Sequence, residues 1–151
     1  MLWPHLLLAL HLTGVIVWVG GMAFAYTCLR PAAMALEPPQ RLTLWVGVFR
    51  RFFPQVWIAV ILILGSGLSM ILRVGFAAAP PGWHLMFAIG LLMMAIFAYV
   101  WFVPWPRLQR AVAQAAWPAG GTALAQIRKA VAVNLGLGLT NVAVATLGLL
   151  L

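Results

Sequence analysis

The chain has 151 residues, of which 66% are hydrophobic and 7% are charged. Nine lysines and arginines stand against one acidic residue, Glu37, so the formal net charge is +8. A single carboxylate excludes carboxylate dyads, di-iron sites and acidic proton relays, and a single cysteine excludes a disulfide framework. The apolar excess is larger than a soluble core of this length needs, and it predicts an integral membrane protein.

Four apolar runs are long enough to cross a bilayer, because roughly 30 Å of hydrocarbon requires about 20 helical residues. The predicted spans are residues 4–29, 54–72, 81–103 and 130–151. Pro4, Pro54 and Pro81 each stand in a predicted first helical turn, where the missing N–H of proline is tolerated. We therefore predict an all-α fold in which one transmembrane domain forms an antiparallel four-helix bundle.

The links between the predicted spans differ in charge. The first carries four arginines and the third carries three arginines and a lysine, whereas the second has only Arg73. The positive-inside rule predicts that the first and third links lie in the cytoplasm and that both termini lie outside. Topology and anionic lipid headgroups explain the basic residues better than nucleic acid does, so we expect the bilayer as the partner.

Both basic links contain amphipathic sequence. Residues 37–53 and 107–117 predict short helices that lie on the cytoplasmic membrane surface. The stretch WPAGG (117–121) is expected to end the second of these helices, and Thr122 could cap a helix that continues into the fourth span. Four aromatic residues of the first link are expected to be interfacial anchors: Trp45, Phe49, Phe52 and Phe53.

Two histidines lie inside predicted spans, His11 in the first and His84 in the third. A titratable ring in hydrocarbon is costly, so a binding role is the default hypothesis. Two imidazoles on separate helices of a bundle are a familiar pair of axial ligands for haem b. Gly14, Trp18 and Gly21 follow His11 on one helix face. The glycines could leave room for the macrocycle, with Trp18 beside it, or they could serve ordinary helix packing.

Copper is the alternative ligand, because imidazole and thioether groups suit Cu(I). With Trp3 and Trp83 as interfacial anchors, a rise of about 1.5 Å per residue puts His11 roughly 12 Å deep and His84 about 2 Å deep. Such different depths are a poor match for two ligands of one iron. The candidate copper ligands are Met1, His5, His84, Met86 and Met93.

Polar residues in the second and fourth predicted spans can be explained by helix packing and hydrogen bonding without a ligand. Asn134 and Asn141 lie on the fourth span, where interhelical hydrogen bonds are the conservative interpretation and a lining for a haem propionate or a quinone is the alternative. Ser66 and Ser69 are expected to serve packing and backbone hydrogen bonds. The sequence thus allows three kinds of partner besides lipid: a quinone, a membrane redox protein, or a second copy of the chain.

Three stretches carry a resemblance to a known family: LHLTGVIVWVGGMAFAY (10–26), FRRFFPQVW (49–57) and HLMFAIGLLMMAIFAYVWF (84–102). With them the chain resembles the CopD family of bacterial membrane proteins, which carries the label copper resistance protein D. It is similar, more distantly, to HemJ-type membrane proteins, which are associated with haem b and with oxidation of protoporphyrinogen. The resemblance implies a multi-pass protein of the bacterial inner membrane in which His11 matches an essential histidine of the first helix.

The chain departs from the HemJ pattern at Met86, where those proteins carry a lysine shortly after the histidine of the third helix. The resemblance therefore gives no support to protoporphyrinogen oxidase activity, and whether the chain is an oxidoreductase stays open. Our leading interpretation is a haem b protein for electron transfer or haem handling, with His11 and His84 as axial ligands. Copper handling in copper resistance is the second, and a non-catalytic subunit or assembly factor of a membrane complex is the third.

Overall fold

A computed structural model describes residues 2–147, and within that range every regular element is a helix. The elements are α1 (Trp3–Val15), η1 (Ile16–Gly20), α2 (Gly21–Phe24), η2 (Ala25–Leu29), α3 (Arg30–Ala33), α4 (Pro38–Val74), η3 (Phe76–Ala78), α5 (Pro81–Phe102), α6 (Pro104–Ala113) and α7 (Trp117–Leu147). In the described part of the chain they form four helical spans long and apolar enough to cross a membrane: Trp3–Ala33, Pro38–Val74, Pro81–Ala113 and Trp117–Leu147. The predicted all-α, multi-pass membrane fold is confirmed, and its apolar surface contacts the lipid bilayer.

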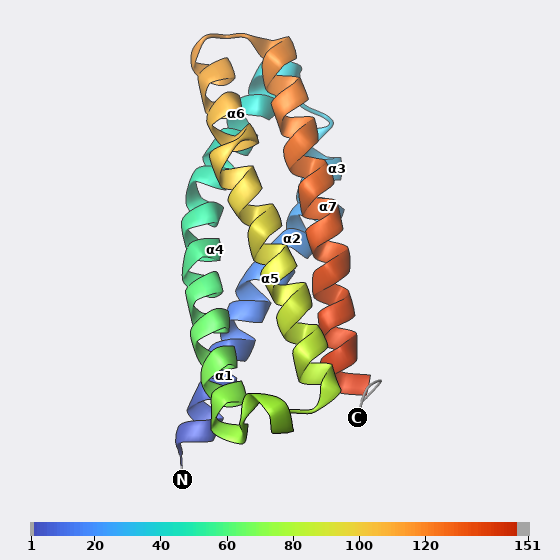
Figure 1. The fold of residues 1–151 in the computed structure, drawn as a ribbon. Helices are drawn as coiled ribbons and strands as arrows, with labels where there is room; N and C mark the ends of the chain where they lie inside the picture. Colours follow the sequence, from blue (N-terminus) through green and yellow to red (C-terminus); the bar gives the residue numbers. More distant parts are fainter. Residues whose placement is uncertain (1, 148–151) are drawn as a thin grey trace.

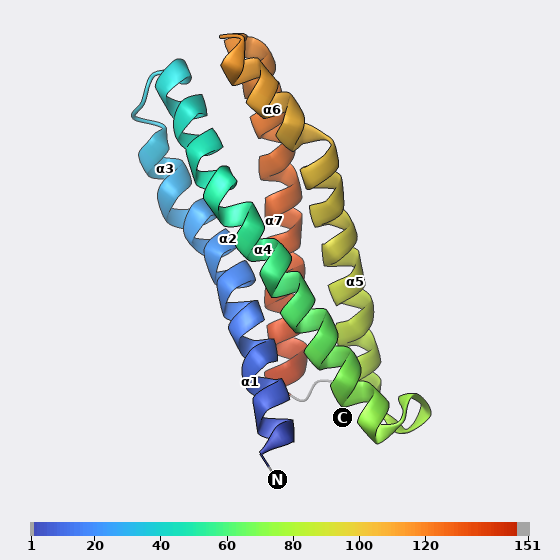
Figure 2. The same ribbon diagram turned by 90° about the vertical axis from the view of Figure 1, so that its left-hand side faces the viewer.

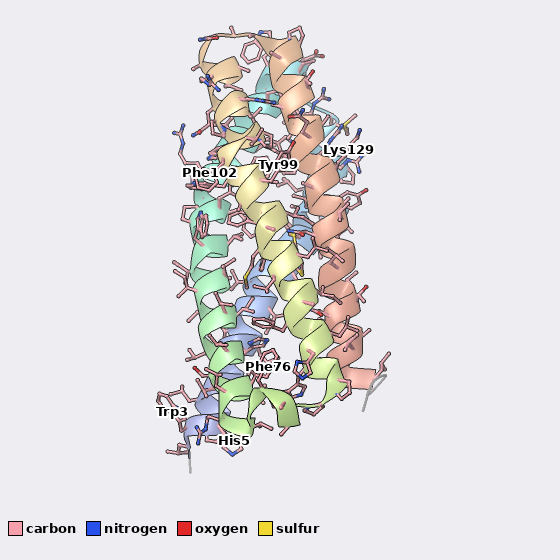
Figure 3. All side chains as sticks on the ribbon, viewed as in Figure 1. Trp3, His5, Phe76, Tyr99, Phe102 and Lys129 are labelled. Carbon is pink, nitrogen blue, oxygen red and sulfur yellow. The ribbon has the colours of Figure 1, made fainter. Side chains whose placement is uncertain are left out.

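Consecutive spans run antiparallel to one another, and the four together form one elongated bundle (Figures 1 and 2). Helix α1 packs mainly on α4, while α7 packs on α5 and α6. We call the end where α1 begins and η3 lies the terminal end, and the end with the links 34–37 and 114–116 the basic end. Of the nine lysines and arginines, only Arg73 lies toward the terminal end. Figure 3 shows Trp3 and His5 at the terminal end and Lys129 toward the basic end.

Local sequence accounts for most of the helix ends. Proline occupies the first turn of α1, α4, α5 and α6, where its missing N–H does not interrupt a helical hydrogen bond. Helix α4 ends at Gly75, whose φ of 92° is a conformation that glycine adopts without steric cost. The starts predicted at Pro4 and Pro81 therefore agree with the structure.

The start predicted at Pro54 is wrong. Helix α4 begins at Pro38 and continues through Pro54, so residues 38–53 belong to the second span and do not form a separate surface helix. Proline inside a helix removes one backbone hydrogen bond, and membrane helices tolerate this loss where neighbouring helices pack around them. The packing comes from α6 and α7, both of which contact α4.

The short helix predicted in the third link is present with shifted bounds, but its surroundings differ from the prediction. Residues 104–113 form α6, which packs along α7 and buries Trp105, Leu108 and Ala111. Helix α7 then begins at Trp117, so WPAGG lies inside a helix instead of ending one. The Thr122 hydroxyl donates to the Pro118 carbonyl within that helix and does not cap it. The last predicted residues of the fourth span, 148–151, lie outside the described residues.

The aromatic residues predicted as interfacial anchors are mostly core residues. Trp45, Phe49 and Phe53 are 4%, 4% and 2% exposed, and only Phe52 is half-buried. Because α4 extends to Pro38, this aromatic stretch packs inside the bundle. Phe49 and Phe53 contact Trp105 of α6, and the Phe52 ring lies beside Gly21 of α2. The centre of the basic half is consequently packed with rings.

Candidate metal-binding cavity

A cavity of about 370 Å³ lies in the terminal half of the bundle. All four spans contribute to its walls, from Leu8 on α1 to Thr146 on α7. None of its lining residues is charged. Its volume lies within the roughly 300–1,000 Å³ typical of small-molecule sites.

His11 projects from α1 to the cavity wall and is held there by α4. Its Nδ1 lies 3.1 Å from Ser66 Oγ. The Ser66 hydroxyl donates its one proton to the Leu62 carbonyl, so toward His11 its oxygen acts as an acceptor. In the tautomer that carries its hydrogen on Nδ1, His11 donates to Ser66 Oγ, and Nε2 keeps a free lone pair. A histidine oriented in this way by its other nitrogen is the usual arrangement of a metal ligand.

The α4 residues around Ser66 make room for the imidazole. A Cβ atom on Gly67 would lie 3.2 Å from His11 Cε1, so glycine allows the ring to pack closely against this helix. Met70 follows one turn later and also lines the cavity. From the sequence, Ser66 was expected to serve only packing and backbone bonds, and neither Gly67 nor Met70 was singled out. Ser66, Gly67 and Met70 stand at positions i, i+1 and i+4 of one helix, and this spacing was the sequence signal that could have identified them.

Sulfur is the commonest ligand atom in the cavity walls. Four methionines line the cavity: Met70 from α4, and Met86, Met93 and Met94 from α5. Met93 is 3% exposed, and its methyl group packs near Gly138 of α7. Within residues 2–147 no three His, Cys, Asp or Glu side chains are grouped so that they could hold a metal ion. The soft side-chain ligands that this cavity offers a metal ion are one imidazole and these thioethers.

The other predicted residues of the first span have separate surroundings. Trp18 is 3% exposed, lines the cavity and makes an edge contact with Phe97 at 6.1 Å between ring centroids. Gly14 lies at the α1–α4 contact, where an added Cβ would lie 3.0 Å from the Ala59 carbonyl oxygen. An added Cβ on Gly21 would overlap the Phe52 ring. Neither glycine lines the cavity.

The π-helical segments η1 and η2 interrupt the first span. Each extra residue in a helical turn rotates the later residues of the span relative to their places in a regular α-helix. The predicted single face of residues 11, 14, 18 and 21 assumed an uninterrupted α-helix, and the structure distributes these residues among different neighbours.

The two asparagines of α7 bind the backbone of α5. Asn134 Nδ2 donates to the Met93 carbonyl at 3.0 Å, and Asn141 Nδ2 donates to the Met86 carbonyl at 3.2 Å. These contacts are interhelical hydrogen bonds, which is what the conservative interpretation of the two asparagines predicts. They fix the α5 backbone at two methionines that line the cavity, and Asn141 is itself a lining residue.

His84 and His5 do not line the cavity. The His84 ring makes an edge contact with Phe76 of η3, with 4.8 Å between ring centroids. His5 is exposed near the start of α1. Met1, the remaining predicted copper ligand, lies outside the described residues. The structure thus brings His11 together with Met86 and Met93 at one cavity and leaves the other two histidines outside it.

A cavity lined by one oriented imidazole and several thioethers is suited to a soft metal ion. The family comparison points to the same chemistry, because the family model described as copper resistance protein D matches residues 46–147. The chain belongs to the CopD family. The match includes Ser66 and all four methionines of the cavity, and it leaves out the first span with His11. The family indicates a membrane protein of copper resistance. No curated protein and no solved structure matches the chain.

Proposed function

We propose that this CopD protein handles copper in the cytoplasmic membrane of a bacterium and binds Cu(I) as its cargo in the terminal-half cavity. His11 Nε2 would be the nitrogen ligand, and methionine thioethers of α4 and α5 would supply sulfur. The single observation that carries the proposal is the His11–Ser66 hydrogen bond at the wall of a methionine-lined cavity, because in the Nδ1–H tautomer it leaves Nε2 free to bind a metal ion.

The chemistry of the walls supports copper over harder metal ions. Cu(I) prefers soft thioether and imidazole ligands, whereas magnesium, calcium and manganese prefer carboxylate and carbonyl oxygens. The cavity has four methionines and no acidic residue. A neutral ligand set also leaves the charge of the bound ion uncompensated, which favours a monovalent cation in an apolar site.

Packing in the basic half supports binding from one side of the membrane. Beyond Trp18, a series of aromatic rings continues toward the basic end: Phe97, Phe53 and Trp105. The ring centroids of Phe97 and Phe53 lie 5.6 Å apart, and those of Phe53 and Trp105 lie 5.3 Å apart. These rings fill the interior between the cavity and the basic end. With the basic end in the cytoplasm, as the charge distribution predicts, the cavity lies in the outer half of the membrane.

Haem b binding is the second candidate function. One observation favours it, the size of an apolar cavity that has an imidazole at its wall. The paired ligation predicted from the sequence does not fit the arrangement, because His84 packs on Phe76 and is not a lining residue. We therefore place copper first and keep haem as an outcome of the test.

Metal titration of the purified protein tests the proposal. Detergent-solubilised protein is titrated with Cu(I) under anaerobic conditions against a chromogenic Cu(I) chelator, which reports the dissociation constant. We expect one tightly bound Cu(I) per chain. His11→Ala should weaken binding more than about 100-fold, beyond the roughly 10–100-fold that loss of a ligand's hydrogen-bond partner costs. His5→Ala is the matched control and should leave the dissociation constant unchanged.

The sulfur ligands have their own matched pair of variants. Met86→Leu with Met93→Leu preserves side-chain volume and removes two thioethers from the cavity, whereas Met22→Leu with Met34→Leu removes two thioethers that do not line it. Only the first pair should weaken Cu(I) binding. Stoichiometric haem in the purified protein, with a Soret band that His11→Ala removes, would overturn the copper proposal in favour of the second candidate.

A further inference from the structure

Helix α7 holds the backbone of α5, the helix that brings three methionines to the cavity. The two helices lie side by side and run in opposite directions (Figure 1). Asn134 and Asn141 stand seven residues apart on α7. Their Nδ2 groups donate to the carbonyls of two α5 residues that are also seven apart, Met93 and Met86. The two hydrogen bonds therefore lie about 10 Å apart along the helices, and together they fix the height and the rotation of α5 relative to α7.

These two hydrogen bonds are poorly suited to stabilising the fold. The Oδ1 atoms of Asn134 and Asn141 are buried, and no group of residues 2–147 donates a hydrogen bond to them. A buried oxygen that accepts no hydrogen bond costs free energy, and interhelical hydrogen bonds in membranes contribute little. Leucine has the same branched shape as asparagine and would bury no unpaired polar atom. Stability alone therefore does not account for an amide at either position.

What the two bonds do fix is the direction of two thioethers. Met86 and Met93 both line the cavity. The direction of a helical side chain follows the rotation of its helix, and each residue turns the helix by about 100°. A change in the rotation of α5 by one residue position would consequently move both sulfur atoms away from the wall that His11 faces.

Gly138 lies between the two asparagines on α7 and gives the Met93 side chain its room. An added Cβ at Gly138 would lie 3.2 Å from Met93 Cε and 2.9 Å from Val19 Cγ2. Gly136, two residues earlier on the same helix, has nothing within 4 Å of an added Cβ. A methyl group at position 138 would therefore displace the end of Met93, whereas one at position 136 would not.

We propose that Asn134, Gly138 and Asn141 are positioning residues of the copper site, which orient the thioethers of Met86 and Met93 without binding the ion. The inference rests on the proposed function, in which these thioethers supply sulfur to Cu(I). Asn141 lines the cavity, but its Nδ2 is bonded to α5 and its Oδ1 is buried, so its amide is not offered as a ligand.

Cu(I) affinity and stability, measured together on the full-length protein, test the role of the two amides. The double variant Asn134→Leu/Asn141→Leu should bind Cu(I) about 10–100-fold more weakly, as expected for loss of groups that orient metal ligands, with its thermal midpoint little changed. Thr140→Val is the matched control on the same helix, because its hydroxyl bonds only the Gly136 carbonyl within α7, and it should leave both quantities unchanged.

A second control separates positioning from a general loss of stability. Phe53→Ala destabilises the basic half and does not touch the cavity. If it weakens Cu(I) binding as much as the double variant does, affinity follows stability and the proposal is overturned. Unchanged affinity in the double variant would also overturn it.

The glycines supply an independent pair of variants. Gly138→Ala should weaken Cu(I) binding by about tenfold, at the lower end of the effect of a lost orienting group, and Gly136→Ala should not change it. Equal effects of the two substitutions would show that room for the Met93 side chain is not the cause.

Methyl NMR of the metal-free protein separates this inference from the proposed function. With ¹³C in the methyl groups of the chain's seven methionines, Met→Leu variants assign the signals. Asn134→Leu should shift the Met93 signal and Asn141→Leu the Met86 signal, while Met34 at the basic end keeps its position. These single variants also serve if the double variant does not fold.

The metal-free spectra decide the positioning role whether or not copper binds. Shifted signals in a protein whose wild type binds no Cu(I) would refute the copper site and support the hold of α7 on the two methionines. Unshifted signals would overturn the positioning role whatever the metal titration shows.

Discussion

The terminal and basic halves of the bundle differ in how their interiors are filled. In the basic half, Phe53 is 2% exposed and Leu108 and Ile127 are 0% exposed, so the helices meet through large, fully packed side chains. In the terminal half, methionines and glycines line the space between the spans, and about 370 Å³ stays open. The comparison indicates that packing in the basic half holds the four spans together. The terminal half can therefore contain an open cavity that binds a ligand.

Truncation of one phenylalanine in each half should give the largest difference in the free energy of unfolding between the two halves. Phe53→Ala removes a ring that packs against several others in the basic half, and we expect it to lower the free energy of unfolding by about 3–5 kcal/mol. Phe87→Ala makes the same change at the cavity wall and should cost less than about half as much, because one side of that ring has no packing partner. Reversible unfolding in mixed detergent micelles measures both, and equal losses would contradict the contrast between the halves.

Loss of the His11 hydrogen-bond partner should affect the site far more than the fold. Ser66→Ala removes the acceptor that holds Nδ1, and we expect Cu(I) affinity to fall about 10–100-fold with little change in stability. Ser69→Ala is the matched control, since its hydroxyl bonds only the Gly65 carbonyl within the same helix. Chelator competition measures both dissociation constants. If the two variants behave alike, the orientation of His11 does not depend on Ser66.

The glycine contact between α1 and α4 should give a smaller effect on stability. Gly14→Ala would place a methyl group 2.7 Å from Ile63 Cγ1 and 3.0 Å from a backbone oxygen of α4, and overpacking of this kind costs about 1–3 kcal/mol. Gly20→Ala has nothing within 4 Å of the added methyl group and should stabilise the helix by about 0.5–1 kcal/mol. Thermal denaturation in detergent compares the two. Destabilisation by both would show that the methyl contact is not the cause.

The sequence predicted the membrane-spanning segments well where apolar runs and basic residues alternate. The starts at Pro4 and Pro81 agree with the structure because each proline stands in the first turn of its helix and precedes an apolar run. The same reasoning failed at Pro54, where the preceding residues are also helical. Whether a proline begins a helix or lies inside one depends on whether the preceding segment has helices to pack against, and that is not a local property.

The candidate site was predicted only in part. Methionines 86 and 93 lie seven residues apart, close to two helical turns, so their shared face was predictable, and both line the cavity. Met70, Ser66 and Gly67 were missed because their role depends on the approach of α1 to α4. The pairing of His11 with His84 assumed that the two helices turn these residues toward one another. No local pattern fixes the rotation of one helix about its axis relative to another.

The sequence alone therefore determined that this protein is a helical membrane protein with its basic residues gathered toward one end. These properties follow from transfer free energies that add along the chain, residue by residue. The tertiary structure decided which side chains enclose the cavity. Those choices depend on helix rotation and close approach between segments distant in sequence, where steric fit at residues such as Gly14 and Gly138 sets the geometry.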